Sequence, residues 1–252
     1  MRRVRVIDEL EQVVPFETDD GSMTLHDRER NVHYRSYHGA VTESRHVFLE
    51  GTALLERRGE WRVAELGFGA AVNFAQTVEA FRADDGVNRL VYRSVDWRPV
   101  TPGHLEFHNG EGGELARQAV AAVHAGQGPV VEVQSDDGAV SLALYAMPWE
   151  EVDWSGFSAH SFYQDPFSKR VNPEGWTAQS FVRAKAAMDG TGRLATYSAA
   201  TSVKRAMFEA GLWVASAPGP GRKREITVAS PSREVLEGDE RLEVLGREKY
   251  VG

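Results

Sequence analysis

The chain has 252 residues, of which 42% are hydrophobic and 26% are charged, and its net charge at pH 7 is −8. This composition suffices for a sizeable core, and the negative charge disfavours a broad, non-specific nucleic-acid binder. The absence of cysteine excludes disulfides, thiolate metal sites and cysteine nucleophiles. The sequence contains no apolar run of about eighteen residues and no signal-like N-terminus, so we expect a cytoplasmic protein without a membrane span.

Residues 1–41 are predicted to form a β-rich extension. Strands are expected at 13–18, 23–25 and 32–37, with a turn cluster, DDGS, at 19–22. From Thr42, a plausible N-cap, apolar residues recur at helical spacing. We therefore place a domain boundary after residue 41 and assign residues 42–252 to the main domain.

The segment 62–74, RVAELGFGAAVNF, has the pattern of a short strand, a glycine turn and the start of a helix. Gly67 and Gly69 permit a tight turn that a ligand can approach closely, and the helix offers free N–H groups at its start. Dinucleotide-binding proteins and S-adenosylmethionine (AdoMet) methyltransferases both use this arrangement. The third glycine of the dinucleotide fingerprint is missing, which counts against a pyrophosphate site. A turn of this kind can also be purely structural.

Asp96 ends a second strand-like run, LVYRSVD, about thirty residues after the glycine turn. In nucleoside-binding sheets, an acidic residue at the end of the second strand accepts hydrogen bonds from the ribose hydroxyls. The alternative is that Asp96 caps the loop before Pro99. Its spacing from the glycine turn favours the ribose role.

Strands and helices alternate along the main domain, which predicts a mostly parallel sheet covered on both faces. Strands are expected at 62–66, 90–96, 130–133, 140–145, 160–164, 193–198, 212–217 and 225–229. Helices are expected at 70–82, 113–125, 173–188 and 201–210. Asn172 as N-cap and Pro173 as first residue favour the start of the third helix. The loop PGPG at 218–221 suggests a hairpin between the last two strands.

The segment 162–176, FYQDPFSKRVNPEGW, places Asp165 at the carboxyl end of a central strand. Open α/β sheets bind their ligands at such ends. An Asp-Pro-aromatic segment there resembles the loop by which many amino-methylating AdoMet enzymes hold a target nitrogen. Alternatively, Asp165 is a turn residue, and Phe167 and Trp176 belong to the core.

Several blocks of this sequence occur together in one known family. They are GAVTESRHVFLEG (39–51), ELGFGAAVNF (65–74), QDPFSKRVNPEGW (164–176), TYSAATSVKRAMFEAG (196–211) and PGPGRKREITVA (218–229). In this order they closely resemble the methyltransferase half of the bifunctional tRNA-modifying enzyme MnmC, and stand-alone proteins with that half alone. The resemblance covers roughly residues 10–230. It implies an α/β, Rossmann-like class I AdoMet-dependent methyltransferase fold.

The resemblance also implies an activity, namely N-methylation of the 5-aminomethyl group of the tRNA wobble uridine to give 5-methylaminomethyl-(2-thio)uridine. AdoMet would be the cofactor, and neither a metal nor FAD would be needed. Other enzymes would have to make the free aminomethyl-uridine. The oligomeric state is not predicted.

The expected site residues fall into three groups. For AdoMet they are Glu65, Gly67, Phe68, Gly69, Asn73 and Asp96. Asp165 is the expected catalytic residue, as acceptor for the amine. Substrate-binding residues are expected at Pro166, Phe167, Lys169, Arg222, Lys223 and Arg224, with Arg170, Lys204 and Arg205 as further basic residues of a phosphate-contacting rim.

The sequence departs from the family at one position. Members usually carry a Gly-Asp pair before the catalytic strand, where the Asp contacts the adenine, but residues 145–148 here read YAMP. Two alternatives therefore stay open. The chain could methylate another amine or RNA on the same fold, or it could be a non-catalytic protein that binds AdoMet or a nucleotide.

Overall fold

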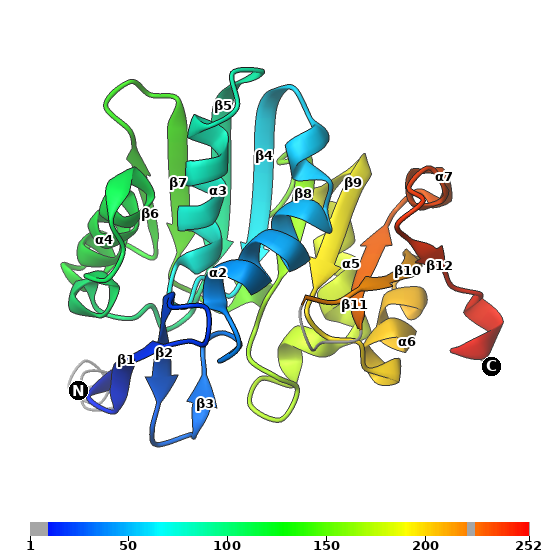
Figure 1. The fold of residues 1–252 in the computed structure, drawn as a ribbon, viewed down its shortest axis with the longest axis horizontal. Helices are drawn as coiled ribbons and strands as arrows, with labels where there is room; N and C mark the ends of the chain where they lie inside the picture. The colour runs from blue at the N-terminus through cyan, green and yellow to red at the C-terminus, as the bar shows by residue number, and fades with distance from the viewer. Residues whose placement is uncertain (1–9, 221–224, 252) are drawn as a thin grey trace.

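The computed structural model describes residues 10–220 and 225–251, whose strands form two sheets (Figure 1). The small sheet contains β1 (Val13–Glu17), β2 (Met23–Asp27) and β3 (Val32–His33). The large sheet contains β4 (Gly59–Leu66), β5 (Val87–Val95), β6 (Val130–Gln134), β7 (Val140–Tyr145), β8 (Ala159–Gln164), β9 (Met188–Thr196), β10 (Trp213–Pro218), β11 (Glu225–Ser230) and β12 (Glu243–Val244). Its strand order is β12-β10-β11-β9-β8-β4-β5-β7-β6.

Along the chain, most of the helices alternate with strands of the large sheet. The α-helices are α2 (Ala40–Glu43), α3 (Val72–Arg82), α4 (Gly110–His124), α5 (Ala178–Ala187), α6 (Thr201–Glu209) and α7 (Arg233–Glu237). A π-helical segment, η1 (Ser44–Glu50), continues α2. Short 3₁₀ segments are η2 (Leu54–Glu56), η3 (Pro102–Leu105), η4 (Trp149–Glu151), η5 (Glu174–Trp176) and η6 (Arg247–Lys249). In the described part of the chain, no helix has the length and apolar character needed to span a membrane.

The centre of the large sheet is parallel and its two ends are antiparallel. Strands β7, β5, β4, β8 and β9 pair in parallel, whereas β6 pairs antiparallel with β7, and β11 with both β9 and β10. A short connection can join only antiparallel neighbours, because a parallel pair needs a crossover. The connections before β7 and before β11 are short, so the expected mostly parallel sheet holds only at the centre. The hairpin pairing expected around the PGPG loop is confirmed, since β10 and β11 pair antiparallel, although residue 221 of that loop lies outside the described residues.

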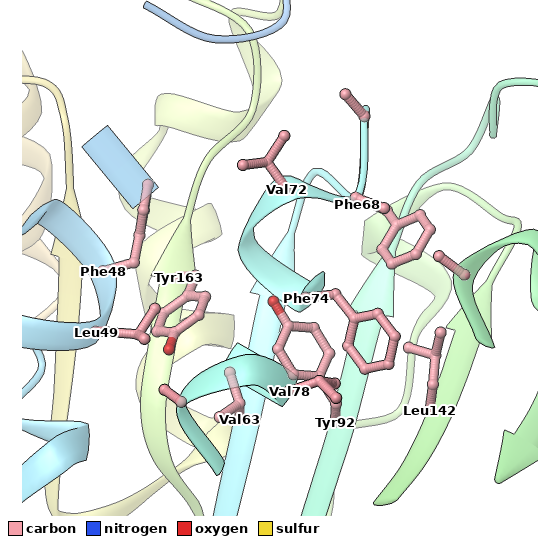
Figure 2. Packing of buried hydrophobic residues seen from close by; sticks show 14 of the residues in the cluster. Phe48, Leu49, Val63, Phe68, Val72, Phe74, Val78, Tyr92, Leu142 and Tyr163 are labelled. Atoms are coloured by element: carbon pink, nitrogen blue, oxygen red, sulfur yellow. The ribbon is translucent and has the colours of Figure 1, made fainter. Parts of the chain in front are cut away.

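Successive residues of the central strands pack on opposite faces of the sheet. Val63 on β4 and Tyr163 on β8 belong to one core cluster, whereas Ala64 and Phe162 belong to the other. The first cluster lies under η1 and α3 (Figure 2), where the ring of Phe74 lies 5.0 Å from that of Tyr92. Burial on both faces is typical of the parallel strands of α/β proteins.

The first helix begins earlier than the sequence predicts. Its N-cap is Gly39, and Thr42 lies inside it with its hydroxyl donating to Asp20 Oδ2 at 2.7 Å. The β1–β2 turn caps this helix: Ser22 Oγ accepts from the amides of Ala40 and Val41, both at 3.1 Å. The prediction of Thr42 as N-cap was wrong because the capping groups come from a distant turn. The domain boundary predicted after residue 41 falls within this helix.

Two other expected elements are shorter in the structure. The strand expected at 32–37 is limited to β3, and the helix expected at 173–188 is divided. Asn172 Oδ1 accepts from the amide of Gly175 at 2.9 Å and so begins the 3₁₀ turn η5. Thr177 then caps α5 by accepting from the amide of Ser180 at 3.1 Å. The Asn-Pro signal was therefore correct for a helical turn but not for the α-helix.

Replacing Phe74 by alanine tests the core beneath α3. Because Phe74 is fully buried, the cavity left by Phe74→Ala should lower the free energy of unfolding by about 3–5 kcal/mol. Urea denaturation followed by circular dichroism measures this loss. Val182→Ala on the exposed side of α5 is the control and should change stability by about 0.5 kcal/mol or less. Equal effects of the two variants would contradict the packing described.

Candidate functional site

A cavity of about 930 Å³ lies at the carboxyl ends of β4, β5 and β8. Its walls include residues 32–37, 66–70, 95–98, 147–150 and 165–168, together with Tyr197. The first of these segments leads from the small sheet to α2, and the others follow strands of the large sheet. The cavity therefore lies where open α/β sheets bind ligands, with one wall supplied by the N-terminal segment.

The glycine turn after β4 makes very close contact with the end of β8. Gly67 has a φ of +100°, and a Cβ at this position would lie 2.5 Å from the carbonyl oxygen of Asp165. A Cβ on Gly69, which has a φ of +51°, would lie 3.1 Å from the ring of Tyr34. Gly67 is therefore required by its backbone conformation and by the close approach of the Asp165 backbone, whereas a side chain at position 69 would be strained and would displace the Tyr34 ring by a few tenths of an ångström.

Asp96 joins the glycine turn to the loop after β5. Its Oδ2 accepts from the amide of Gly69 at 2.9 Å, and its Oδ1 accepts from the amide of Arg98 at 3.0 Å. Burial raises the pKa of Asp96, and these two hydrogen bonds oppose the rise. Trp97 follows on the cavity wall with 56% of its surface exposed, and Arg98 Cζ lies 3.9 Å from its ring centroid.

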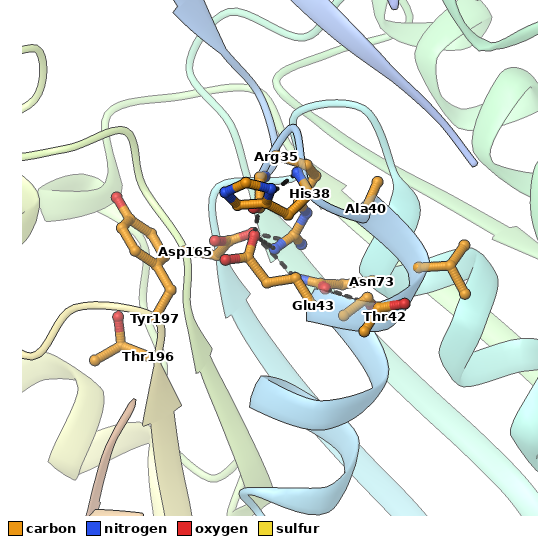
Figure 3. A network of polar contacts seen from close by, with 12 residues as sticks. Arg35, His38, Ala40, Thr42, Glu43, Asn73, Asp165, Thr196 and Tyr197 are labelled. Carbon is orange, nitrogen blue, oxygen red and sulfur yellow. Dashed lines mark hydrogen bonds and ion pairs between the residues drawn. The ribbon is translucent and has the colours of Figure 1, made fainter. Parts of the chain in front are cut away.

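Asp165 lies on the cavity wall within a buried polar network (Figure 3). Its Oδ2 is 2.5 Å from Arg35 Nη2 and accepts from Asn73 Nδ2 at 3.1 Å. Asn73 Nδ2 also donates to Glu65 Oε1 at 2.8 Å, and Ser94 Oγ donates to Glu65 Oε2 at 2.7 Å. The network therefore connects the ends of β4, β5 and β8 with α3 and the N-terminal segment.

Burial controls the ionisation of both carboxyl groups in this network. It raises the pKa of Asp165 well above its ordinary value; Arg35 opposes this rise, and the negative charges of Glu43 and Glu65 add to it. Burial also raises the pKa of Glu65 to about 7, although hydrogen bonds from Ser94 and Asn73 lower it. Raised carboxyl pKa values in a cleft are typical of proton acceptors that work near neutral pH.

The structure brings most of the expected site residues together. Those that line the cavity are Gly67, Phe68, Gly69, Asp96, Asp165, Pro166 and Phe167. Glu65 and Asn73 are buried behind the wall, where they hold Asp165 and the β5 strand in place. Lys169 is exposed in the loop after β8. Arg222, Lys223 and Arg224 lie outside the described residues.

Lys204 does not form part of a phosphate-contacting rim, whereas the rim role of Arg205, which is exposed on α6, stays a prediction. Lys204 is buried, where it forms an ion pair with Glu225 and donates to Ser216 Oγ at 3.0 Å. Arg205 Nε donates to the carbonyl oxygen of Tyr250 at 2.8 Å. These contacts could not be anticipated, because Glu225 and Tyr250 lie far along the chain.

Trp176 is a core residue, as the alternative interpretation allowed. It is 2% exposed, and its Nε1 donates to the carbonyl oxygen of Phe167 at 2.8 Å. Phe167 itself lines the cavity, with its ring 4.8 Å from that of Tyr34.

Several residues that line the cavity were not predicted from the sequence. Tyr34 and Arg35 were assigned to a strand of the extension, with no signal that would link them to Asp165. Tyr197 lay within a family-like block, but its role was not visible; its hydroxyl donates to the carbonyl oxygen of Pro166 at 2.8 Å. Met147 lies in the segment without the Gly-Asp pair and contributes to the wall.

Comparisons with known proteins identify the family. A family model described as S-adenosyl-L-methionine-dependent methyltransferase matches residues 111–232. The chain is 35% identical over 205 residues to the tRNA 5-methylaminomethyl-2-thiouridine biosynthesis bifunctional protein MnmC of Ralstonia nicotianae, a match that covers 78% of this chain and 31% of the relative. The chain is an AdoMet-dependent methyltransferase.

The MnmC protein of Cupriavidus metallidurans is 33% identical over 238 residues, which cover 87% of this methyltransferase and 34% of the relative. The chain thus spans about a third of the length of these curated relatives. The crystal structure of MNMC2 from Aquifex aeolicus superposes with a TM-score of 0.71 at 24% identity, covering 92% of this chain and 77% of that one. The resemblance to the methyltransferase portion of MnmC and the Rossmann-like fold are confirmed.

The raised pKa of Glu65 predicts a pH dependence of stability. The unfolded chain loses this proton near the ordinary pKa of 4.5, whereas the folded protein retains it to about 7. Protonated Glu65 therefore contributes roughly 3 kcal/mol to the free energy of unfolding below pH 4.5, and this contribution is lost as the pH rises to about 7. Urea denaturation at about pH 5 and pH 8 should show a smaller loss for Glu65→Gln than for the wild type. An identical loss would show that Glu65 is ionised throughout this range.

Proposed function

We propose that this methyltransferase transfers a methyl group from AdoMet to the 5-aminomethyl nitrogen of the tRNA wobble uridine, giving 5-methylaminomethyl-(2-thio)uridine. The curated relatives are named for the biosynthesis of that nucleoside. The observation that carries the proposal is the position of Asp165. This buried acceptor lies on the cavity wall, with its own backbone packed against the glycine turn.

The residues of the turn fit AdoMet. Gly67 and Gly69 leave the backbone open to a ligand; a side chain at position 67 would collide with the Asp165 carbonyl, and one at position 69 would press on the Tyr34 ring. Asp96 lies at the end of β5, where nucleoside-binding sheets hold ribose hydroxyls. Each carboxylate oxygen has a second lone pair for such a hydroxyl besides its backbone hydrogen bond. Bound AdoMet supplies a methyl group already activated on its sulfonium.

The protein's own contribution is to prepare and orient the amine. A primary alkylammonium has no lone pair for attack, so the site must bind or create the neutral amine. Asp165 accepts the hydrogen bond or proton of that amine. Tyr197 holds the carbonyl of Pro166 and so fixes the loop beside it. Holding the nitrogen in line with the methyl group supplies most of the rate gain.

The proposed RNA contact lies around the mouth of the cavity. Arg30 and Arg98 line the cavity, and Lys169 and Arg170 are exposed in the adjoining loop. Together with the segment 222–224, they would contact phosphates near the wobble position. A cytoplasmic location, independence of FAD and reliance on other enzymes for aminomethyl-uridine belong to the same proposal. So does the division of the chain into an N-terminal extension, residues 1–41, and a methyltransferase domain, residues 42–252.

The first prediction for this function concerns the cofactor. Asp96→Ala removes the proposed acceptor for the ribose hydroxyls and should weaken binding of S-adenosylhomocysteine by about tenfold to a hundredfold. Isothermal titration calorimetry measures the affinity. Glu132→Ala, an exposed site on β6, is the matched control. Equal affinities in folded Asp96→Ala and control proteins would remove Asp96 from the cofactor site.

The second prediction concerns catalysis. Asp165→Asn keeps the shape of the side chain but removes its charge, so turnover on tRNA carrying aminomethyl-uridine should fall by about 10²–10⁴-fold. The affinity for S-adenosylhomocysteine should change little. The remaining activity should rise with pH, because free neutral amine becomes limiting.

Mass spectrometry of the methylated nucleoside provides the measurement. Near-native turnover of Asp165→Asn at neutral pH would reduce Asp165 to a turn residue. A wild-type protein that binds S-adenosylhomocysteine but does not methylate this tRNA would favour another amine or RNA as substrate. Failure to bind the cofactor analogue would favour a non-catalytic protein that binds a nucleotide other than AdoMet.

A further inference from the structure

Arg35 is a buried cation on the wall of the cavity. It lies between β3 and α2, with only 7% of its surface exposed. Its Nη2 contacts Asp165 Oδ2 at 2.5 Å, and its Nη1 lies 3.9 Å from Glu43 Oε2. The ring of Phe48 covers the guanidinium, with Arg35 Cζ 5.0 Å from the ring centroid. This packing holds the ion pair in surroundings that exclude most water.

The contacts of Asp165 are unevenly divided between its two oxygens. The ion pair with Arg35 and the hydrogen bond from Asn73 both involve Oδ2. With Oδ2 held from two directions, the carboxylate plane is fixed. Oδ1 is then the oxygen that an incoming amine would meet.

We propose that Arg35 is a positioning residue that keeps Asp165 ionised and orients it so that Oδ1 receives the amine. This inference rests on the proposed function in assigning the amine to Asp165. It adds a residue that acts through Asp165 without touching the substrate. It also makes the segment 32–37, which carries Arg35, a functional part of the proposed catalytic site.

The charges around Asp165 require such a cation. Glu43 from α2 and Glu65 from β4 face Asp165 from two sides, and both raise the pKa of Asp165. Asn73 from α3 contributes a neutral donor, and Tyr197 lies beside Asp165 (Figure 3), with its hydroxyl donating to the carbonyl oxygen of Pro166 at 2.8 Å. A buried carboxylate among like charges takes up a proton unless a cation compensates it. Loss of Arg35 would raise the pKa of Asp165 further and so disfavour the ionised form that accepts the amine's proton.

A purely structural role makes a different prediction. If Arg35 stabilised the fold only through contacts other than its ion pair with Asp165, its loss would destabilise the fold whatever the charge of Asp165. If it balances that charge, neutralising Asp165 should relieve the loss. A double-mutant cycle separates the two roles, because interacting charges are non-additive.

The first measurement needs no activity. Thermal unfolding is compared for the wild type, Arg35→Gln, Asp165→Asn and the double variant at neutral pH. Arg35→Gln should lower Tm by about 5 °C or more, and adding Asp165→Asn should recover most of the loss. Additive losses would overturn the proposal. This cycle remains decisive for the ion pair even if the proposed RNA substrate proves to be wrong.

The second measurement uses the pH dependence of kcat with aminomethyl-uridine tRNA. In Arg35→Gln the acid limb should move upward by about one pH unit or more, with KM for tRNA and the affinity for S-adenosylhomocysteine unchanged. Arg35→Lys should restore part of the shift, because it returns the charge. Arg28→Ala, an exposed arginine of the same N-terminal hairpin, is the control and should behave as wild type. An unmoved acid limb, or a loss confined to cofactor affinity, would contradict the positioning role.

Discussion

The contact between the glycine turn after β4 and the end of β8 is the constraint on which the site depends. The Asp165 carbonyl oxygen lies 2.5 Å from the position that a Cβ at residue 67 would take. The backbones of the two strand ends are therefore in direct contact, with no side chain between them. The amide of Asp165 donates to the carbonyl of Leu66 at 3.0 Å, and the amide of Gly67 donates to that of Val95 at 2.9 Å. These bonds extend the sheet by one residue past β4. The proposed cofactor turn and the proposed amine acceptor are thereby held in one rigid frame.

Beneath this contact, buried hydrogen bonds fix the positions of two carboxyl groups, Glu65 and Asp165, relative to each other. Asn73 on the first turn of α3 donates to both Glu65 and Asp165, and its Oδ1 accepts from Ser44 Oγ at 2.7 Å. One amide thus connects two carboxylates and the segment that follows α2. Removing a single partner from such a network leaves buried groups unsatisfied, so its members are expected to act together.

The N-terminal segment completes the cavity and is itself held by polar contacts. The turn between β1 and β2 caps α2, which fixes the path of residues 34–37 along the cavity wall. Tyr34 packs against Phe167, and Arg35 pairs with Asp165. The small sheet is therefore coupled to the loop after β8 through aromatic and ionic contacts.

The sequence by itself determined the central strands, the glycine turn, and the positions of Asp96 and Asp165 directly after their strands. Local patterns suffice for this, because they specify strand ends, turns and the residues beside them. Only the tertiary structure decided the partners of these residues. Arg35 and Asp165 are 130 positions apart in the chain, and no local pattern records such a pairing. The same reason explains why Lys204 was misplaced and why the cap of the first helix was missed. Periodicity and turn chemistry act over a few residues, whereas burial and ion pairing are decided by packing between distant segments.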